Sequence, residues 1–285
     1  MKSIIKWLKI IRPGTLFASV SPVVIGLLVA NKVVDINCLV AVITIVCALS
    51  IQILSNFIND YFDFKRGLDK KDRLGPKRAL AEGTIDEKTM KKAIGIDLAI
   101  TLLSGAYLIY VGGLPILLIG VFSIIFAWLY TATSHSLSYL GIADIFVFVF
   151  FGLLATTGTT FLQTHTFILQ SFLLGAVCGS VSTCVLVVNN IRDIASDKEN
   201  NKKSFVVRFG KKSGYGEYLF FVLLTFVFSF LACGLSITNL VSLFGLAVFF
   251  MVIKAKGRQY NKCLVFTGLL NVVFVVLFAI DSCLR

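Results

Sequence analysis

The sequence predicts an all-α, polytopic membrane protein, and three of its features lead to this fold class. Residues of the hydrophobic set make up 57% of the 285-residue chain, and charged residues make up only 15%. Soluble domains carry about 25% charged residues, so a soluble fold with this composition would leave much apolar surface in water. The apolar residues also gather in runs long enough to cross a bilayer, and the positive charges fall in alternate gaps between those runs.

The apolar runs predict nine transmembrane helices, because a spanning helix needs about 20 predominantly apolar residues. The third and fourth runs are separated only by Gly112 and Gly113, and the seventh and eighth by a short polar patch near Thr238. The first run follows a basic segment, as in a signal peptide, but no small-residue cleavage site closes it, so we expect a retained helix. The runs are residues 14–31, 37–57, 91–111, 113–131, 141–162, 167–189, 215–235, 237–253 and 262–282.

The positive charges predict the orientation of the chain. If nine spans alternate across the membrane, all but two of the 27 Lys and Arg residues fall on one side, the exceptions being Lys32 and Arg285. Positive charge marks the cytoplasmic side, so we expect the N-terminus and both long loops in the cytoplasm and the C-terminus outside a cell (inner) membrane. The net charge of +12 is thereby explained by topology and anionic lipid, and we expect no nucleic-acid partner.

The first of two acidic motifs closes the second run and reads SNFINDYFDFKRGLD. On a helix, Asn56, Asp60 and Asp63 are spaced by four and three residues, so one face presents an amide and two carboxylates. Asn59 stands four residues before Asp63 and adds a second amide. Gly67 is a helix-stop signal, because glycine adopts the left-handed conformation that ends many helices.

The second motif closes the sixth run and reads VVNNIRDIASDKENNKK. Asn189, Asp193 and Asp197 are spaced by four residues and again share one helix face. Like charges at this spacing repel one another, and a helix end embedded in a membrane adds a desolvation cost. A cation near each motif would offset both penalties.

Together the motifs favour Mg²⁺ shared with a substrate diphosphate. Hard oxygen ligands on a rigid face suit this ion, and basic residues that suit the phosphate oxygens follow the acidic ones in both loops. A single motif would be explained better by a solvated loop whose Asp and Asn side chains cap helix ends. Two motifs, four spans apart and on the same side of the membrane, favour a functional site.

The two motifs also resemble those of a known family. NDYFDFKRGLD (59–69) and NNIRDIASD (189–197) are similar to the two aspartate-rich motifs of the UbiA superfamily of intramembrane prenyltransferases. Between residue 12 and about residue 210 the chain most resembles the MenA branch, which acts on 1,4-dihydroxy-2-naphthoate. The last three spans resemble this branch only in their hydropathy. The resemblance implies a single transmembrane domain over residues 1–285, with nine helices around a central cavity. Its cytoplasmic cap would consist of the loops at about 58–90 and 190–214.

The resemblance also implies a reaction and a set of site residues. A polyprenyl chain would pass from prenyl diphosphate to 1,4-dihydroxy-2-naphthoate, with loss of CO₂ and diphosphate, to give demethylmenaquinone. The expected catalytic residues, which would hold two Mg²⁺ ions, are Asp60, Asp63, Asp193 and Asp197, with Asn56, Asn59 and Asn189 as further metal ligands. The expected diphosphate ligands are Arg66, Lys77, Arg78, Arg192 and Lys202. The expected contacts to the acceptor or the prenyl chain are Tyr61, Tyr130, Tyr139 and Asp144.

Two alternatives stay open at this point. The aromatic acceptor could instead be of the 4-hydroxybenzoate or homogentisate type. A transporter is the alternative from another class, but transporters break their helices with Gly or Pro near a midplane site. Here the only four prolines are at 13, 22, 76 and 115, and the charges cluster at one membrane face. The sequence therefore favours an enzyme whose partners are the lipid bilayer, a prenyl diphosphate and an aromatic acceptor.

Overall fold

The computed structural model describes residues 2–67, 74–75, 78–131 and 142–284, without the side chains of residues 2–5, 9 and 126–131. Within these residues it contains helices and no strand, so the predicted all-α class is confirmed. Eight of the helical segments described are long and apolar enough to cross a membrane. The helices are α1 (Lys2–Ile11), α2 (Pro13–Ala30), α3 (Cys38–Lys65), α4 (Glu87–Thr131), α6 (Ala143–Phe148), η1 (Val149–Leu154), α7 (Ala155–Thr164), α8 (Leu169–Glu199), α9 (Phe205–Phe209), α10 (Lys211–Cys233), η2 (Ile237–Asn239), α11 (Leu240–Lys254), η3 (Gly257–Gln259) and α12 (Tyr260–Leu284).

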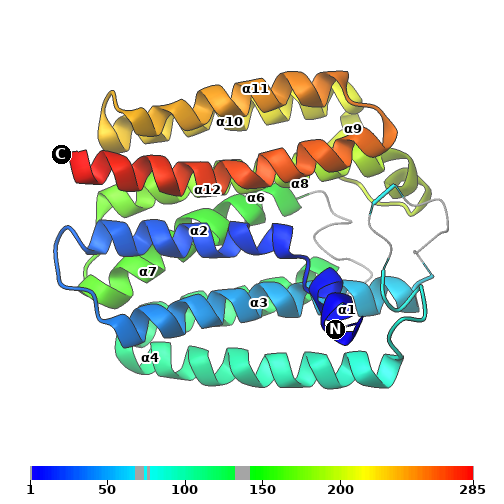
Figure 1. Cartoon of the computed structure of the whole chain (residues 1–285), viewed down its shortest axis with the longest axis horizontal. Coiled ribbons are helices and arrows are strands. Elements are labelled where there is room, and N and C mark those ends of the chain that lie inside the picture. The colour runs from blue at the N-terminus through cyan, green and yellow to red at the C-terminus, as the bar shows by residue number, and fades with distance from the viewer. Residues whose placement is uncertain (1, 68–73, 76–77, 132–141, 285) are drawn as a thin grey trace.

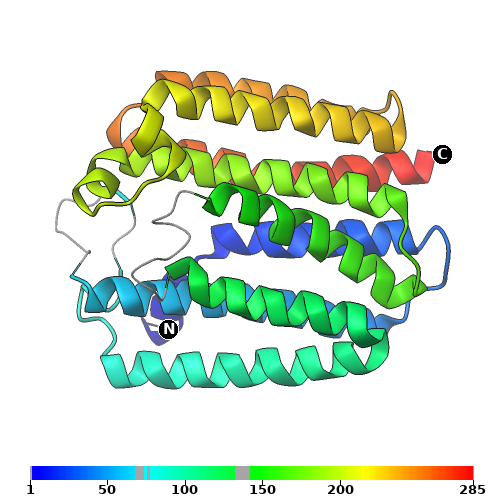
Figure 2. The ribbon, with the colours of Figure 1, turned by 180° about the vertical axis from the view of Figure 1, so that it is seen from behind.

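Helix α4 consists of two helical arms joined at Gly113. The backbone of this glycine is not helical, with φ 63° and ψ −149°, and Pro115 follows within the first turn of the second arm. A straight helix over the 39-residue candidate span Glu87–Ile125 would be about 58 Å long, about twice the thickness of the hydrocarbon core. The two arms run in opposite directions (Figure 2) and match the predicted third and fourth runs.

The helices that carry the acidic motifs continue beyond their apolar runs. α3 has 28 residues and α8 has 31, which correspond to lengths of about 42 and 46 Å. The predicted runs end at residues 57 and 189, whereas the helices end at Lys65 and Glu199. Gly67 adopts the expected left-handed conformation, with φ 64°, just after α3. Both motifs therefore lie on helix, as the residue spacing predicts.

The motif-bearing ends of α3 and α8 lie at the same end of the bundle, together with α1 (Figure 1). The α2–α3 and α7–α8 connections and the C-terminus lie at the opposite end, and Figure 2 agrees from behind. α1 packs against α3, and the rings of Trp7 and Phe57 have centroids 5.8 Å apart. A small core that includes Ile10, Leu80 and Met90 fixes the segment before α4 against these helices.

Close backbone packing joins η1 and α6 to α8. A Cβ on Gly152 would lie 2.4 Å from the carbonyl oxygen of Gly175, and one on Gly179 would lie 2.4 Å from that of Phe148. Only glycine fits at such approaches, and small residues serve this purpose between membrane helices. This contact fixes the first turn of α6, which carries Asp144, against the middle of α8.

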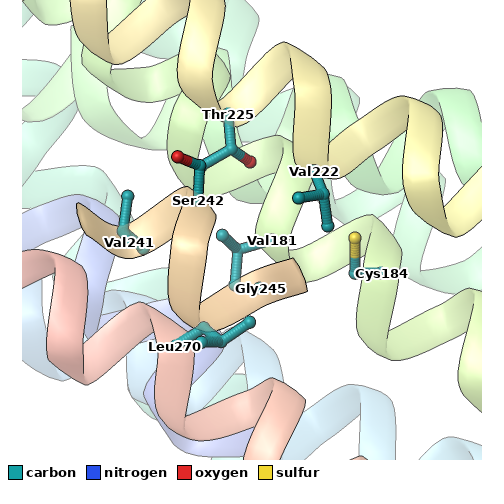
Figure 3. A pocket seen from close by; sticks show the side chains of 8 residues that line it. All are labelled: Val181, Cys184, Val222, Thr225, Val241, Ser242, Gly245 and Leu270. Carbon is teal, nitrogen blue, oxygen red and sulfur yellow. The ribbon is translucent and has the colours of Figure 1, made fainter. Parts of the chain in front are cut away.

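Helices α10 and α12 pack against α8, and α11 packs against α10 and α12. They leave a cavity of about 10 Å³ (Figure 3), which has room for at most one water molecule. It is therefore a packing defect and has no room for a prenyl chain. Its lining residues are Val181, Cys184, Val222, Thr225, Val241, Ser242, Gly245 and Leu270.

Candidate active site

The first motif is a pair of buried carboxylates bridged by one guanidinium. Asp60 is 3% exposed, and Asp63 is also buried, on the same face of α3. Arg78 reaches this face from the segment before α4, where its Nη2 forms an ion pair with Asp63 Oδ2 and its Nε lies 3.9 Å from Asp60 Oδ1. Its Nη1 also donates to the backbone oxygen of Asn59, at 2.6 Å. The guanidinium therefore offsets part of the negative charge of the motif and holds the loop to the helix.

The Asn56 side chain is engaged elsewhere. Its Nδ2 donates to the backbone oxygen of Ile11 at 2.8 Å and to Thr15 Oγ1 at 3.0 Å. Its Oδ1 accepts from Gln52 at 3.4 Å. These bonds hold the junction between α1 and α2, where Arg12 adopts φ 55°. Asn56 thus ties α3 to α1, and the metal-ligand role expected for it stays a prediction.

The second motif carries its countercharge on the same helix. Arg192 makes a bidentate contact with the neighbouring Asp193, from Nε to Oδ1 at 2.8 Å and from Nη2 to Oδ2 at 2.6 Å. Its Nη2 also donates to Asn189 Oδ1 at 2.7 Å. The side chain of Arg192 is 4% exposed and that of Asp193 15%. The structure thus brings together three of the residues expected in this motif.

The remaining carboxylate of this motif is paired with a residue beyond the helix end. Lys202 Nζ lies 3.1 Å from Asp197 Oδ1, and the Lys202 backbone N–H donates to the Asp197 carbonyl oxygen at 2.9 Å. Asn201, with φ 56°, makes the turn that brings the chain back. Lys202, an expected diphosphate ligand, therefore lies beside the second motif.

Asn261, at the start of α12, links the two motifs and was missed from the sequence. Its Oδ1 accepts from Arg192 Nη1 at 2.9 Å, and its Nδ2 donates to the carbonyl oxygen of Leu74 at 3.0 Å. One amide therefore connects the second motif to the loop of the first. No spacing signal marks this residue, because the link joins positions 187 residues apart.

Tyr61 lies on a different side of α3 from the carboxylate pair. Its hydroxyl donates to Glu87 Oε1 at 3.1 Å, and the Nζ atoms of Lys65 and Lys91 lie 5.9 and 5.7 Å from its ring centroid. These contacts face α4 and favour a structural role, so an acceptor contact stays a prediction. Arg66 lies beside the first motif with its guanidinium 6.0 Å from the Phe62 ring.

Three expected site residues cannot be placed, because Lys77, Tyr139 and the side chain of Tyr130 lie outside the described residues. Asp144 is placed, in the first turn of α6, where it is 7% exposed. Its backbone oxygen accepts from Thr183 on α8, at 3.4 Å. α6 begins further inside the bundle than the ends of α3 and α8 (Figures 1 and 2), so Asp144 lies deeper than the two motifs.

The donor set fits Mg²⁺ that is shared with a phosphorylated substrate. Within the described residues, no three acidic, His or Cys side chains gather into a metal-binding group. Each motif instead offers two aspartates, and Mg²⁺ is commonly held by one or two carboxylates plus substrate phosphates and water. Three basic side chains, Arg78, Arg192 and Lys202, pair with these four aspartates and are also of the types that bind phosphate. The net negative charge that is left favours a cation at the site.

The bundle is multi-pass and all-α, and it carries paired carboxylates and guanidiniums at one end. An intramembrane enzyme that acts on a diphosphate ester requires such an arrangement. A family model described as the UbiA prenyltransferase family matches residues 19–278. The chain belongs to this family and is a membrane prenyltransferase.

Relatives and solved structures agree with this assignment. The chain is 40% identical over 211 residues to 1,4-dihydroxy-2-naphthoate octaprenyltransferase of Escherichia coli (strain K12), covering 72% of this chain and 68% of that protein. The protein of the same name from Haemophilus influenzae is 35% identical, with 73% and 70% covered. The apo structure of a UbiA homolog from Aeropyrum pernix K1 has a TM-score of 0.72 at 17% identity, covering 94% and 97% of the two chains. A UbiA homolog from Archaeoglobus fulgidus bound to DMAPP and Mg²⁺ has a TM-score of 0.67 at 18% identity, covering 97% and 99%.

Proposed function

We propose that this chain transfers a polyprenyl group from a prenyl diphosphate to 1,4-dihydroxy-2-naphthoate, with loss of CO₂ and diphosphate, to give demethylmenaquinone in its reduced, quinol form. The observation that carries the proposal is the pair of aspartate motifs at one end of the bundle, each paired with basic side chains. The acceptor is supported by relatives of 30–40% identity that are named for this substrate.

Two Mg²⁺ ions bound by Asp60, Asp63, Asp193 and Asp197 would neutralise the diphosphate as the allylic C–O bond breaks. Arg78 and Arg192 now donate to these carboxylates, and each guanidinium has five N–H donors. With the carboxylates engaged by metal, the two guanidiniums would be free to bind the phosphate oxygens, whose geometry they match bidentately. The two arginines therefore hold the site in order before the substrate binds and bind its leaving group afterwards. Asn59 and Asn189 are proposed to assist at the metal, and Arg66, Lys77 and Lys202 at the diphosphate.

The proposal includes the architecture implied by the family. With the two arms of α4 counted as two spans, we propose nine spanning helices around a central cavity within one domain over residues 1–285. The cap consists of the loops at about 58–90 and 190–214. The cavity keeps the allylic cation away from water, and its walls open to lipid for the prenyl tail. Asp144, and Tyr61, Tyr130 and Tyr139, are the proposed contacts to the acceptor or the prenyl chain.

The function is tested in membranes that contain the protein, supplied with Mg²⁺, a radiolabelled long prenyl diphosphate and a single acceptor. We expect prenylated product and release of CO₂ with 1,4-dihydroxy-2-naphthoate, and loss of turnover on chelation with EDTA. Product formed only with 4-hydroxybenzoate would overturn the acceptor assignment. Turnover that survives removal of Mg²⁺ would overturn the metal assignment.

The orientation, with the N-terminus cytoplasmic and the C-terminus outside, is tested with the native cysteines. Cys38 and Cys283 are exposed and belong to the end of the bundle opposite the motifs, whereas the other five cysteines are buried. We expect a membrane-impermeant maleimide to label both in intact cells, and a C38S/C283S variant to stay unlabelled. Labelling that appears only after the cells are opened would show the reverse orientation.

A further inference from the structure

A second acidic site lies deeper in the bundle than the two motifs. Asp144 is 7% exposed, and its Oδ1 is buried without a hydrogen-bond partner. Glu217, on α10, has a buried Oε2 in the same situation. Among the residues that the structure describes, no basic side chain forms an ion pair with either carboxylate. Both belong to helices that cross the membrane, where an unpartnered carboxylate is costly and marks a functional site.

Ring contacts place the two carboxylates at the same depth. α6 and α10 both start toward the motif-bearing end and run away from it (Figure 2). The rings of Phe148 and Phe221 have centroids 6.1 Å apart, and each ring lies four residues, or one helical turn, beyond its acidic residue. Asp144 and Glu217 therefore lie one turn closer to the motifs than these rings, on helices that both pack against α8.

Consecutive residues of α8 anchor both helices. The Thr183 hydroxyl donates to the Asp144 carbonyl oxygen at 3.4 Å, and Cys184 Sγ donates to the carbonyl oxygen of Tyr218, next to Glu217, at 3.7 Å. These two bonds to backbone carbonyl oxygens hold the segments that carry Asp144 and Glu217 beside α8.

The face of α8 that carries Thr183 also carries residues of the second motif. Thr183, Asn190 and Asp197 are spaced by seven residues, which is close to two full turns, so they lie in one row. At 1.5 Å per residue, Asn190 is about 10 Å from the level of Thr183. This distance suits an aromatic ring system held between the deep carboxylates and the proposed diphosphate site.

We propose that Asp144 and Glu217 form the hydroxyl-binding end of the acceptor site and accept hydrogen bonds from a hydroxylated aromatic ring. This inference rests on the proposed function. Glu217 has no assigned role otherwise, and the inference gives both carboxylates the donors that they lack. A neutral dihydroxy ring satisfies them, whereas a second carboxylate would be repelled, so the carboxyl group of the acceptor points away from this end.

The pair also participates in the proton balance of the reaction. Transfer of a hydroxyl proton to a carboxylate oxygen leaves the O–H electron pair on the ring oxygen and makes the ring a stronger nucleophile. The ring carbon then bonds to the allylic cation, and loss of CO₂ returns the electrons of the broken C–C bond to the ring. The ring oxygen takes its proton back from the carboxyl group, so the pair ends in its initial state.

Direct binding of 1,4-dihydroxynaphthalene, followed by its fluorescence, tests the inference in detergent-solubilised protein. We expect Asp144→Asn to weaken binding about tenfold and Glu217→Gln a few-fold, because each loses a charged acceptor. Methylation of the ring hydroxyls should weaken binding to the native protein but change little in Asp144→Asn. Asp97→Asn is the matched control, because Asp97 is a buried acid of α4 that already accepts from the Ser50 hydroxyl at 2.8 Å.

Kinetics separate this inference from the proposed function. In Asp144→Asn and Glu217→Gln we expect a raised KM for the naphthoate and an unchanged KM for the prenyl diphosphate. Native binding and native naphthoate KM in both variants would overturn the acceptor-site inference while leaving the proposed function intact. If the native protein binds the dihydroxy ring but prenylates no naphthoate, the proposed function fails and the binding data still decide the role of the pair. Glu217→Gln serves as an independent variant should Asp144→Asn fail to fold.

Discussion

The two aspartate motifs have similar sequences but balance their charges in different ways. In the first motif the countercharge is Arg78, which comes from a loop 15 residues beyond Asp63 and reaches both carboxylates. In the second, Arg192 is the chain neighbour of Asp193, and Lys202 reaches back to Asp197 from just beyond the helix end. The first motif therefore depends on the fold of a loop, whereas the second is almost complete on a single helix.

This difference indicates different roles for the first and the second motif in substrate binding. Breaking the first pairing frees a loop segment and leaves two buried carboxylates together, which is costly. Breaking the second leaves the helix and its neighbours in place. We infer that the first motif responds to substrate by rearrangement of its loop, and that the second is the fixed half.

The largest effect is expected where the motifs are alike. Asp60→Ala and Asp193→Ala should each insert and fold yet lower kcat about 10³-fold, because each removes charge stabilisation of the leaving diphosphate. Turnover of purified protein with saturating Mg²⁺ measures the loss, and Asp35→Ala, in the exposed α2–α3 connection, is the control. Near-normal turnover in either variant would remove that aspartate from the metal site.

A comparison of thermal stability distinguishes the two motifs. Without Mg²⁺, both Arg78→Gln and Arg192→Gln break a buried ion pair, at a cost of about 3–5 kcal/mol. Arg78→Gln should lower the unfolding temperature more, because it also leaves two carboxylates together and removes the bond from the loop to Asn59. Since Mg²⁺ can replace the lost positive charge, its addition should restore most of the loss in Arg78→Gln. Thermal unfolding in EDTA and in Mg²⁺ measures both effects. Equal losses that Mg²⁺ does not change would contradict the assigned difference between the motifs.

Asn261 should show an intermediate effect, because it links the halves without touching a carboxylate. We expect Asn261→Ala to raise the KM for prenyl diphosphate about tenfold, the usual scale for losing a hydrogen bond to a charged group. Asn261→Asp can still accept from Arg192 but cannot donate to Leu74, so it tests the loop link alone. Asn271→Ala, deeper in α12, is the control, and equal KM values in all variants would exclude a positioning role.

The smallest effect is expected at Lys202. Its side chain is 26% exposed, and such ion pairs contribute about 1 kcal/mol or less. We expect Lys202→Met to change kcat/KM two- to fivefold, and the difference from the native protein to shrink as salt is raised. A hundredfold loss that is independent of salt would instead give Lys202 a direct role at the leaving group.

The sequence by itself determined the fold class, the spans and the two motifs, because these depend on local patterns. Apolar runs set the spans, and the residue spacing put Asp60, Asp63, Asp193 and Asp197 on helix faces, as the structure has them. The apolar runs end at residues 57 and 189, and the residue spacing together with the helix-stop signal at Gly67 predicted that helix continues through the motifs, as it does in α3 and α8. The sequence also predicted the break at Gly113, where a pair of glycines separates the third apolar run from the fourth.

Only the tertiary structure decided which groups meet across the bundle. Asn261 contacts a residue 187 positions away, and the ring of Phe221, one turn beyond Glu217 on α10, lies 6.1 Å from that of Phe148 at the end of α6. Asn56 has the expected helix face but uses its amide to hold α1. Side-chain partners at such separations are set by how helices pack and by where glycines allow close approach. These are properties of the assembled bundle that no local spacing in the chain contains.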